Sequence, residues 1–250
     1  MKHWAPLLVR IVVLALLVAF LVAPGSFASV FLPLTKNGQP PIYTQNDFLG
    51  LALNHLEIVA AATIASTVFA VGLAILVTRP AGREFLPLSR SLANIGQTFP
   101  PVAVLAIAVP LLGFGTAPTL VALFLYGLLP IFENALTGLT TLPPEVTEAA
   151  LGVGMTGPQR LLQVELPLAL PVILAGIRLS VVVSIATATI GSTVAAHTLG
   201  EVIIAGLTTD NTAWVLEGGL IVAVLAVLIY DALSALERML TARSGRRAQG

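Results

Sequence analysis

Few residues of this chain have the types and spacing that chemistry requires. A phosphate-binding loop ends in Lys followed by Ser or Thr, and the only lysines, Lys2 and Lys36, follow no Gly-rich run. The three histidines are far apart and lack the spacing of metal ligands. Ser192 and His197 are five residues apart, off a common helical face, so they make a weak nucleophile and base pair. We therefore expect no catalytic residue, no metal and no cofactor.

Three ionisable residues, Arg178, Glu133 and Asp231, lie inside long apolar segments. A charge near the middle of a bilayer costs ~2.5 to 3.5 kcal/mol on insertion scales, which favours a buried partner. We expect Arg178 to pair with Glu133 or Asp231. Two roles are open for such a pair: an ion pair near a gate that rearranges, or a static clamp between two helices.

Small residues recur along the same segment as Arg178, at intervals that place them on one helical face. They are Gly176, Ser180, Ser184, Thr187 and Gly191. Small side chains let helices approach closely, so a packing seam is the simpler interpretation. Lining of a pore is the alternative.

The stretch 141–167 is polar and carries the signals of two short helices. Pro143 and Pro144 suit a helix start, and Gly152 and Gly154 suit its end. The sequence therefore predicts a first short helix between these two pairs.

The second short helix is predicted to begin at Thr156. Gln159, three residues on, completes the capping-box pattern, and Pro167 is expected to end the run. Together the two helices would form a compact knob.

Composition places the chain in a membrane, because 57% of its residues are hydrophobic against 10% charged and the mean hydropathy is +0.98. A span takes ~20 apolar residues. We expect six spans in a single all-α domain: 7–32, 51–77, 92–112, 118–139, 168–194 and 214–236. Residues 35–47 are expected to form an irregular outer loop. Prolines at 100, 101, 110 and 130 predict short or kinked third and fourth spans.

Six spans place both termini on one side, and the basic residues show which side that is. Of the twelve Lys and Arg, ten fall on the side of the termini: Lys2, Arg10, Arg79, Arg83, Arg90, Arg160, Arg238, Arg243, Arg246 and Arg247. The positive-inside rule makes this side cytoplasmic, including the 141–167 loop. Trp4 and Trp214 suit span ends, and Glu57, near the outer end of the second span, is expected to reach the interface.

The first span has a competing interpretation as a cleaved signal peptide. Lys2 and Arg10 precede an apolar core, and Ser26-Phe27-Ala28 is a candidate cleavage site. We expect an uncleaved anchor, because apolar residues continue through 30–32. In either case the 141–167 loop stays cytoplasmic.

The 141–167 loop resembles the signature loop of the permease subunits of binding-protein-dependent ABC importers. The pattern is Glu148-Ala149-Ala150, three residues, Gly154, nine residues, Val164, one residue and Leu166-Pro167. In that family the cytoplasmic loop docks into a cleft of a separate ATPase subunit. The resemblance therefore assigns a role in ATPase coupling to Glu148, Ala149, Ala150, Gly154, Leu166 and Pro167.

Within that family, residues 93–240 look like the glycine betaine, carnitine and choline branch. The match is carried by 97–100, 113–116, 122–131, 165–178 and 186–191, with departures at 133 and 195–198. The resemblance implies a type I importer permease fold, divided into a first span and outer loop (1–47), a permease core (48–238) and a cytoplasmic tail (239–250).

The resemblance also implies partners and a place in the cell. The expected partners are cytoplasmic ABC ATPase subunits that bind the ATP, a second permease copy or a paralogue, an extracytoplasmic solute-binding protein and the lipid bilayer, with no nucleic acid. The location is a bacterial cytoplasmic (inner) membrane. Alternatives to an osmoprotectant permease are a permease for another small polar solute, such as an amino acid, or a stand-alone secondary transporter.

Overall fold

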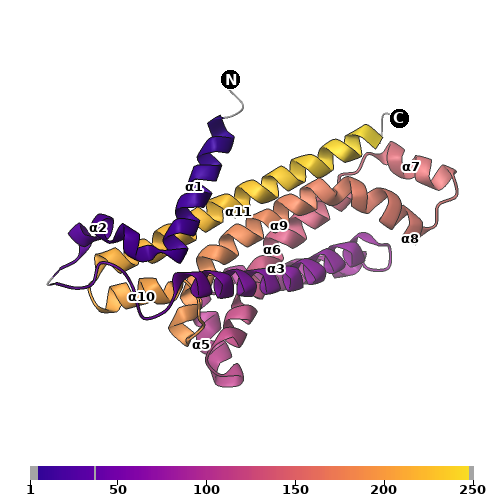
Figure 1. Ribbon diagram of the computed structural model, residues 1–250. Coiled ribbons are helices and arrows are strands. Elements are labelled where there is room, and N and C mark those ends of the chain that lie inside the picture. Colours follow the sequence, from indigo (N-terminus) through magenta and orange to yellow (C-terminus); the bar gives the residue numbers. More distant parts are fainter. Residues whose placement is uncertain (1–4, 37, 248–250) are drawn as a thin grey trace. The chain divides into compact units, whose positions relative to one another are not determined.

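The structure, a computed structural model, describes residues 5–36 and 38–247 (Figure 1). The regular elements of these two stretches are helices, which confirms the all-α expectation. Lys2 and Trp4 lie outside the described residues, and the side chains of Arg243, Arg246 and Arg247 are outside them as well.

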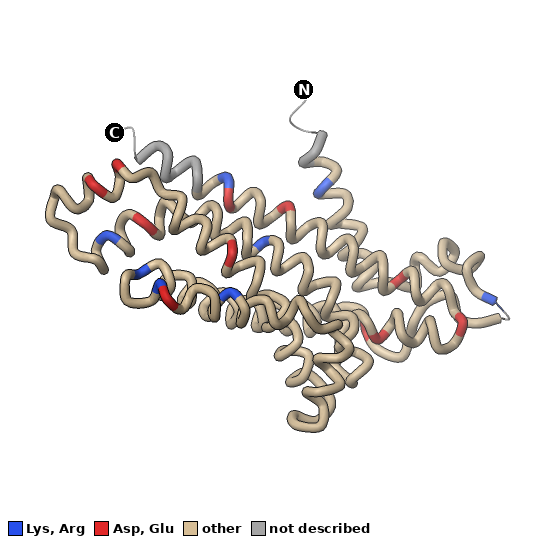
Figure 2. The backbone as a smooth tube through the Cα atoms, turned by 180° about the vertical axis from the view of Figure 1, so that it is seen from behind, with Lys and Arg blue, Asp and Glu red and all other residues tan. Residues whose placement is uncertain are grey.

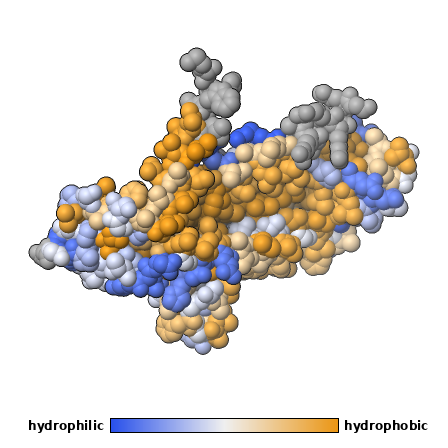
Figure 3. All heavy atoms as spheres, viewed as in Figure 1, coloured by the Kyte–Doolittle hydropathy of each residue, from blue (hydrophilic) through white to orange (hydrophobic). Residues whose placement is uncertain are grey.

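Four described segments are long and apolar enough to cross a membrane without a break. They match the second, fourth, fifth and sixth expected spans: α3 (Phe48–Thr78), α6 (Thr116–Thr140), the segment Gly157–Val194 with α9 (Leu166–Ala188), and α11 (Thr212–Arg247) over Thr212–Leu240. Figure 3 shows hydrophobic residues covering the visible sides of α1 and of α11. Such surfaces are expected of helices that face lipid.

The first and third expected spans are bent rather than straight. The chain bends by 113° between α1 (Ala5–Val22) and the short helical segment that follows it. That segment consists of η1 (Pro24–Phe27), α2 (Ala28–Phe31) and η2 (Leu32–Leu34). Likewise η3 (Arg83–Phe85) and α4 (Leu86–Thr98) meet α5 (Pro101–Leu112) at 97°. Phe99, before Pro100, has extended backbone angles, as a residue preceding proline prefers. If each bent pair is one span, the total is six, as expected.

The fourth span was expected to be short or kinked; it is not short, because α6 continues through Pro130 over 25 residues, and a kink stays a prediction. Proline has no N–H, so the carbonyl of Tyr126, four residues earlier, loses its helical partner. The side chain of Gln97 replaces that donor, with Nε2 3.1 Å from Tyr126 O. The freed carbonyl is therefore satisfied, and the helix tolerates the proline.

The chain forms two compact units, each assembled from separate stretches of sequence. Unit 1 contains 1–61, 100–123 and 184–229, and unit 2 contains 62–99, 124–183 and 230–250. The expected boundaries near residues 47 and 238 stay predictions. Each unit has its own interior, and the two are described separately below.

The interior of unit 2 is aliphatic and built from α3, α4, α6 and α9. Its fully buried members include Ala74, Ile131, Phe132 and Ala135. Small alanines on α3 and α6 leave room for larger side chains opposite them, which allows close helix packing. In Figure 2 charged residues of unit 2 gather around α7, α8 and the α3–α4 connection.

The interior of unit 1 is aromatic at the outer loop. Phe20 lies 5.3 Å from Phe48 between ring centroids, and Tyr43 lies 5.3 Å from Trp214, edge to face. The described residues of the loop, 35–36 and 38–47, are irregular after η2, as expected. It is tied to the start of α11, where Asn211 Nδ2 donates to Pro40 O at 3.1 Å.

Candidate functional site

The first helix of the 141–167 loop forms as predicted. α7 spans Pro144–Gly152, with Pro143 as its N-cap and Pro144 in its first turn. Gly154 has φ of 78°, a left-handed conformation that favours glycine. Its N–H donates to Leu151 O at 2.9 Å, which closes the end of the helix.

The second helix begins as predicted but does not end at Pro167. α8 (Gly157–Arg160) has a capping box in which Thr156 N–H donates to Gln159 Oε1 at 2.9 Å. The chain then makes a π-helical turn, η4 (Leu161–Glu165), and continues into α9. Pro167 is the second residue of α9 and follows the π turn directly. The second helix of the loop is therefore continuous with a membrane span (Figure 1).

The tip of the loop exposes apolar side chains. Leu151 is 55% exposed and Val153 is 76% exposed, beside exposed Glu148 and Ala149, whereas Ala150 is buried. Exposed leucine and valine next to a charged residue, outside the long apolar helices, form a surface suited to a protein partner.

Glu165 connects the loop to two helices, a role that the sequence analysis missed. Its side chain is buried, yet Arg79 Nη2 lies 2.5 Å from Oε2 and Arg160 Nε lies 2.7 Å from Oε1. Arg79 directly follows α3, and Arg160 ends α8. One carboxylate therefore joins the end of α3, the short helix α8 and the π turn before α9. The sequence signal that could have drawn attention to Glu165 is its position in the loop motif, between Val164 and Leu166.

The expected partners of Arg178 were wrong. Its Nη1 lies 2.6 Å from Glu237 Oε2 and 2.9 Å from Ser234 Oγ, and its guanidinium lies 4.9 Å from the centroid of the Tyr230 ring. Positions 230, 234 and 237 share one face of α11, and Asp231 is about 100° away from Tyr230 around the helix. Asp231 has an interaction of its own.

Glu133, the other expected partner, binds Arg90 of α4 instead. Arg90 Nε lies 2.6 Å from Oε1 and Nη2 lies 3.1 Å from Oε2, so the contact is bidentate. The structure thus contains two clamps, α9 to α11 through Arg178 and α4 to α6 through Arg90. Rearrangement of either clamp during transport stays a prediction.

The small-residue stripe, which runs along α9 and into η5, packs against other helices of this chain. A Cβ on Gly176 would lie 2.7 Å from Pro130 O and 2.6 Å from the Asn134 Cβ, so α6 approaches here closely. Thr187 is half-buried, and the other four members are buried: Gly176, Ser180, Ser184 and Gly191. These contacts are those of a packing seam, and a pore-lining role stays a prediction.

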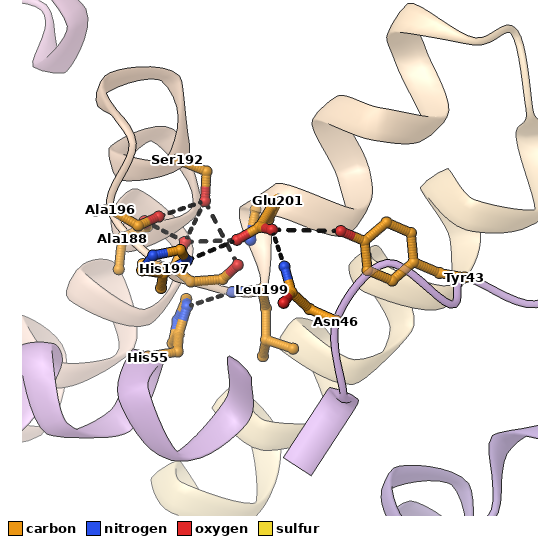
Figure 4. Close-up of polar contacts among 11 residues, drawn as sticks. Tyr43, Asn46, His55, Ala188, Ser192, Ala196, His197, Leu199 and Glu201 are labelled. Carbon is orange, nitrogen blue, oxygen red and sulfur yellow. Dashed lines mark hydrogen bonds and ion pairs between the residues drawn. The ribbon is translucent and has the colours of Figure 1, made fainter. Parts of the chain in front are cut away.

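The fifth span is helical only to Ala188 and then forms a compact segment of unit 1. η5 (Thr189–Val194) is followed by α10 (Gly200–Thr208), which the sequence analysis did not anticipate. A Cβ on Gly200 would lie 1.8 Å from Thr189 O, so the two elements touch through backbone. Ser192 Oγ bonds Ala196 O at 3.1 Å and Thr198 Oγ1 at 2.8 Å, and His197 contacts Glu201, so Ser192 and His197 are not paired (Figure 4).

His55 holds this segment to α3. It is fully buried, its Nε2 lies 3.0 Å from Ile185 O, and its Nδ1 lies 3.4 Å from Leu199 N (Figure 4). Since a carbonyl only accepts and an amide N–H only donates, these contacts require a neutral ring with the proton on Nε2. The sequence analysis treated His55 only as a rejected metal ligand.

The outer loop is tied to α10 by Glu201. Tyr43 Oη donates to Glu201 Oε1 at 3.4 Å, and Asn46 Nδ2 donates to the same oxygen. Burial, followed by the nearby Glu201 charge, raises the pKa of the Tyr43 phenol. Tyr43 is therefore a neutral hydrogen-bond donor at physiological pH.

The fold and the loop define a class: a multi-pass helical membrane protein with a two-helix loop inserted between two spans. Residues 70–245 match the family described as the binding-protein-dependent transport system inner membrane component, and the chain belongs to that family. It is a multi-pass inner membrane permease, which confirms the resemblance of the 141–167 loop.

Curated relatives carry related descriptions. The chain is 40% identical to the osmoprotectant import permease protein OsmY of Salmonella typhimurium, over 76% of this chain and 80% of that protein. It is 37% identical to the glycine betaine/carnitine/choline transport system permease protein OpuCB of Bacillus subtilis, over 75% and 85%. It is 39% identical to the carnitine transport permease protein OpuCB of Listeria monocytogenes, over 78% and 88%.

Solved structures show the same fold. A chain of the MetNI methionine ABC transporter in inward-facing conformations has a TM-score of 0.69 at 20% identity, covering 77% of this chain and 95% of that one. A chain of an amino acid ABC transporter, solved with histidines, has a TM-score of 0.60 at 17% identity, covering 78% and 92%. This likeness confirms the expected importer permease fold.

Proposed function

We propose that this chain forms the translocation pathway of an ABC importer for a small osmoprotectant such as glycine betaine, choline or carnitine. One observation carries the proposal: the chain is 37% to 40% identical to permeases that are named for the import of these solutes. The solute would arrive on an extracytoplasmic solute-binding protein. The pathway would form with a second copy of the chain or with a paralogous permease.

The energy would come from a separate ATPase that docks on the 141–167 loop. Leu151 and Val153 supply exposed apolar contacts at the tip of the loop, and Glu148 supplies charge beside them. Burial of such side chains is the main favourable term in protein association. The proposal places this loop and both termini on the cytoplasmic side, where the basic residues cluster.

Movement of the docked loop would reach two membrane helices together. α8 continues through the π turn into α9, so a pull on α8 is passed along a continuous helix. The ion pair between Glu165 and Arg79 links the end of α3 to α8 and α9, so α3 would move with them. Coupling between sites needs such contiguous rigid elements, whose two arrangements both ends can bias.

The test is uptake by proteoliposomes that contain this chain, its ATPase and its solute-binding protein. Labelled glycine betaine, choline, carnitine and proline are compared with ATP or with a non-hydrolysable analogue inside. ATP-dependent uptake of at least one quaternary ammonium solute supports the proposal. ATP-dependent uptake of proline alone would replace the solute class, and ATP-independent uptake would contradict the importer mechanism itself.

A further inference from the structure

Unit 1 contains a hollow with polar and apolar walls, whose most informative residue is an acid on α3. The hollow has a volume of about 250 Å³ and is lined by Asn54, Glu57 and Ala61 of α3, by Thr116 and Leu120 of α6, and by His197. The α3 residues recur at intervals of three and four, so they share one face of that helix. The volume lies below the ~300 to 1,000 Å³ of pockets for drug-sized ligands, so the hollow suits a small solute.

Glu57 lies inside the membrane-spanning helix rather than at its end. It is nine residues beyond Phe48, the first residue of α3, which is about 13 Å along a helix with 1.5 Å of rise per residue. That Glu57 reaches the interface stays a prediction, because the 31 residues of α3 exceed the ~20 that a span takes. An acid at such a position normally faces a cavity or a partner and marks a path for charged solutes.

Among the described residues, the Glu57 carboxylate has neither an ion-pair nor a hydrogen-bond partner. This sets it apart from Glu133 and Glu165, which both bind arginine. The one imidazole at the hollow, His197, is 74% exposed and directs Nδ1 to Glu201 Oε2 at 3.3 Å. Figure 4 shows that contact on the α10 side. The Glu57 carboxylate is therefore available to a positively charged group that enters the hollow.

The remaining walls fit a small organic cation. Ala61 and Leu120 are apolar and suit methyl or methylene groups, while Asn54 and Thr116 offer hydrogen bonds to a hydroxyl or carboxylate of the solute. The hollow is open to solvent and Glu57 is exposed, so the attraction is screened and weak. A transport pathway needs such binding, favourable enough for entry and weak enough for release.

We propose that this hollow is a transient binding site for the positively charged group of the transported solute, with the Glu57 carboxylate as its counter-charge. The inference rests on the proposed function, because an importer of organic cations is the reason for such a cation to arrive. It adds a specific site within the permease and a role for charge in it.

The experiment compares Glu57→Gln with wild type in the reconstituted importer, with saturating solute-binding protein. Glu57→Gln keeps the size and removes the charge, and Glu57→Asp keeps the charge on a shorter side chain. We expect choline uptake to fall about tenfold in Glu57→Gln, the equivalent of ~1.4 kcal/mol, and less in Glu57→Asp. The loss should be smaller for glycine betaine, whose own carboxylate partly offsets its charge. The matched control is Glu84→Gln, an exposed acid of η3 outside the hollow.

A second variant keeps the test decisive if Glu57→Gln fails to insert. Ala61→Leu fills the hollow without changing its charge and should also lower uptake. If the wild type carries choline and both variants match it, the site is overturned while the importer function stands. If the wild type carries no quaternary ammonium solute, the proposed function and this site fall together.

Discussion

Unit 2 and unit 1 hold their helices together with different chemistry. In unit 2, arginine–carboxylate pairs join helices at Glu165, Glu133 and Glu237. In the described part of unit 1, the ion pairs Lys36–Asp210 and His197–Glu201 lie in exposed segments. Its buried contacts include neutral groups such as His55 and Thr198, and the carboxyl group of Glu217, which accepts from the Tyr43 N–H at 3.1 Å.

The difference matches the tasks proposed for the two units. Helices that transmit a pull from a docked ATPase need strong, directional contacts, and charge-assisted hydrogen bonds are about twice as strong as neutral ones. A unit that handles a charged solute needs a carboxylate left available, as Glu57 is. The comparison therefore separates charges that join helices from Glu57, for which we propose a role in transport.

The largest effect should come from Glu165→Ala in unit 2. The substitution leaves Arg79 and Arg160 without their shared counter-charge in a partly buried place. Breaking a buried pair costs 3–5 kcal/mol, and we expect about 3 kcal/mol because both arginines are partly exposed. Thermal unfolding of the detergent-solubilised protein would measure the loss. Glu84→Ala is the control, and a loss equal to that of the control would show that Glu165 does not join the helices.

In unit 1 the contact between η5 and α10 depends on close backbone packing, so Gly200→Ala is the matching test. The added Cβ would meet Thr189 O at 1.8 Å and force η5 and α10 apart. Overpacking of this kind costs about 1–3 kcal/mol. Gly219→Ala, on α11 with nothing within 4 Å of its Cβ, is the control. Equal unfolding temperatures for the two variants would contradict the packing described here.

The Arg178–Glu237 pair should show an intermediate effect. A double-mutant cycle with Arg178→Gln and Glu237→Gln should give a coupling energy of about 1–2 kcal/mol, within the range for residues in one network. The same cycle with Glu133→Gln in place of Glu237→Gln should give close to zero, because Glu133 binds Arg90. A larger coupling to Glu133 than to Glu237 would restore the expectation from sequence.

The smallest effect should come from Lys36 and Asp210 in unit 1. Their side chains are 59% and 81% exposed, and the contact is 3.1 Å. Exposed ion pairs contribute about 0.2–1 kcal/mol, less at high salt. Lys36→Gln should therefore shift the unfolding temperature barely at all. A loss as large as that of Glu165→Ala would remove the distinction between the two units.

Local sequence signals predicted the elements of the site well. Proline, glycine and capping-box positions placed α7 and the start of α8, because these residues act through their own backbone. Hydropathy located the spans, because length and apolarity decide membrane insertion. The pattern Glu148-Ala149-Ala150 to Pro167 identified the family, which the comparisons confirmed.

Long-range contacts could not be predicted in the same way. The choice of Glu237 over Asp231 depends on which face of α11 meets α9, and the bridge from Glu165 to Arg79 joins residues 86 apart. The continuation of α6 past Pro130 depends on Gln97, a side chain from another helix. Hydropathy and spacing contain no information on these pairings, because each needs the helices to be packed first.

The most direct test of ATPase coupling through the 141–167 loop compares Gly154→Val with Gly152→Val. Neither Cβ would meet another atom within 4 Å, but only Gly154 has a left-handed backbone, with φ of 78°. Valine at Gly154 should distort the tip of the loop. Uptake per ATP hydrolysed should fall about tenfold, the equivalent of ~1.4 kcal/mol, while Gly152→Val should stay close to wild type. An unchanged ratio in Gly154→Val, with the variant inserted and the ATPase bound, would contradict the role of this loop.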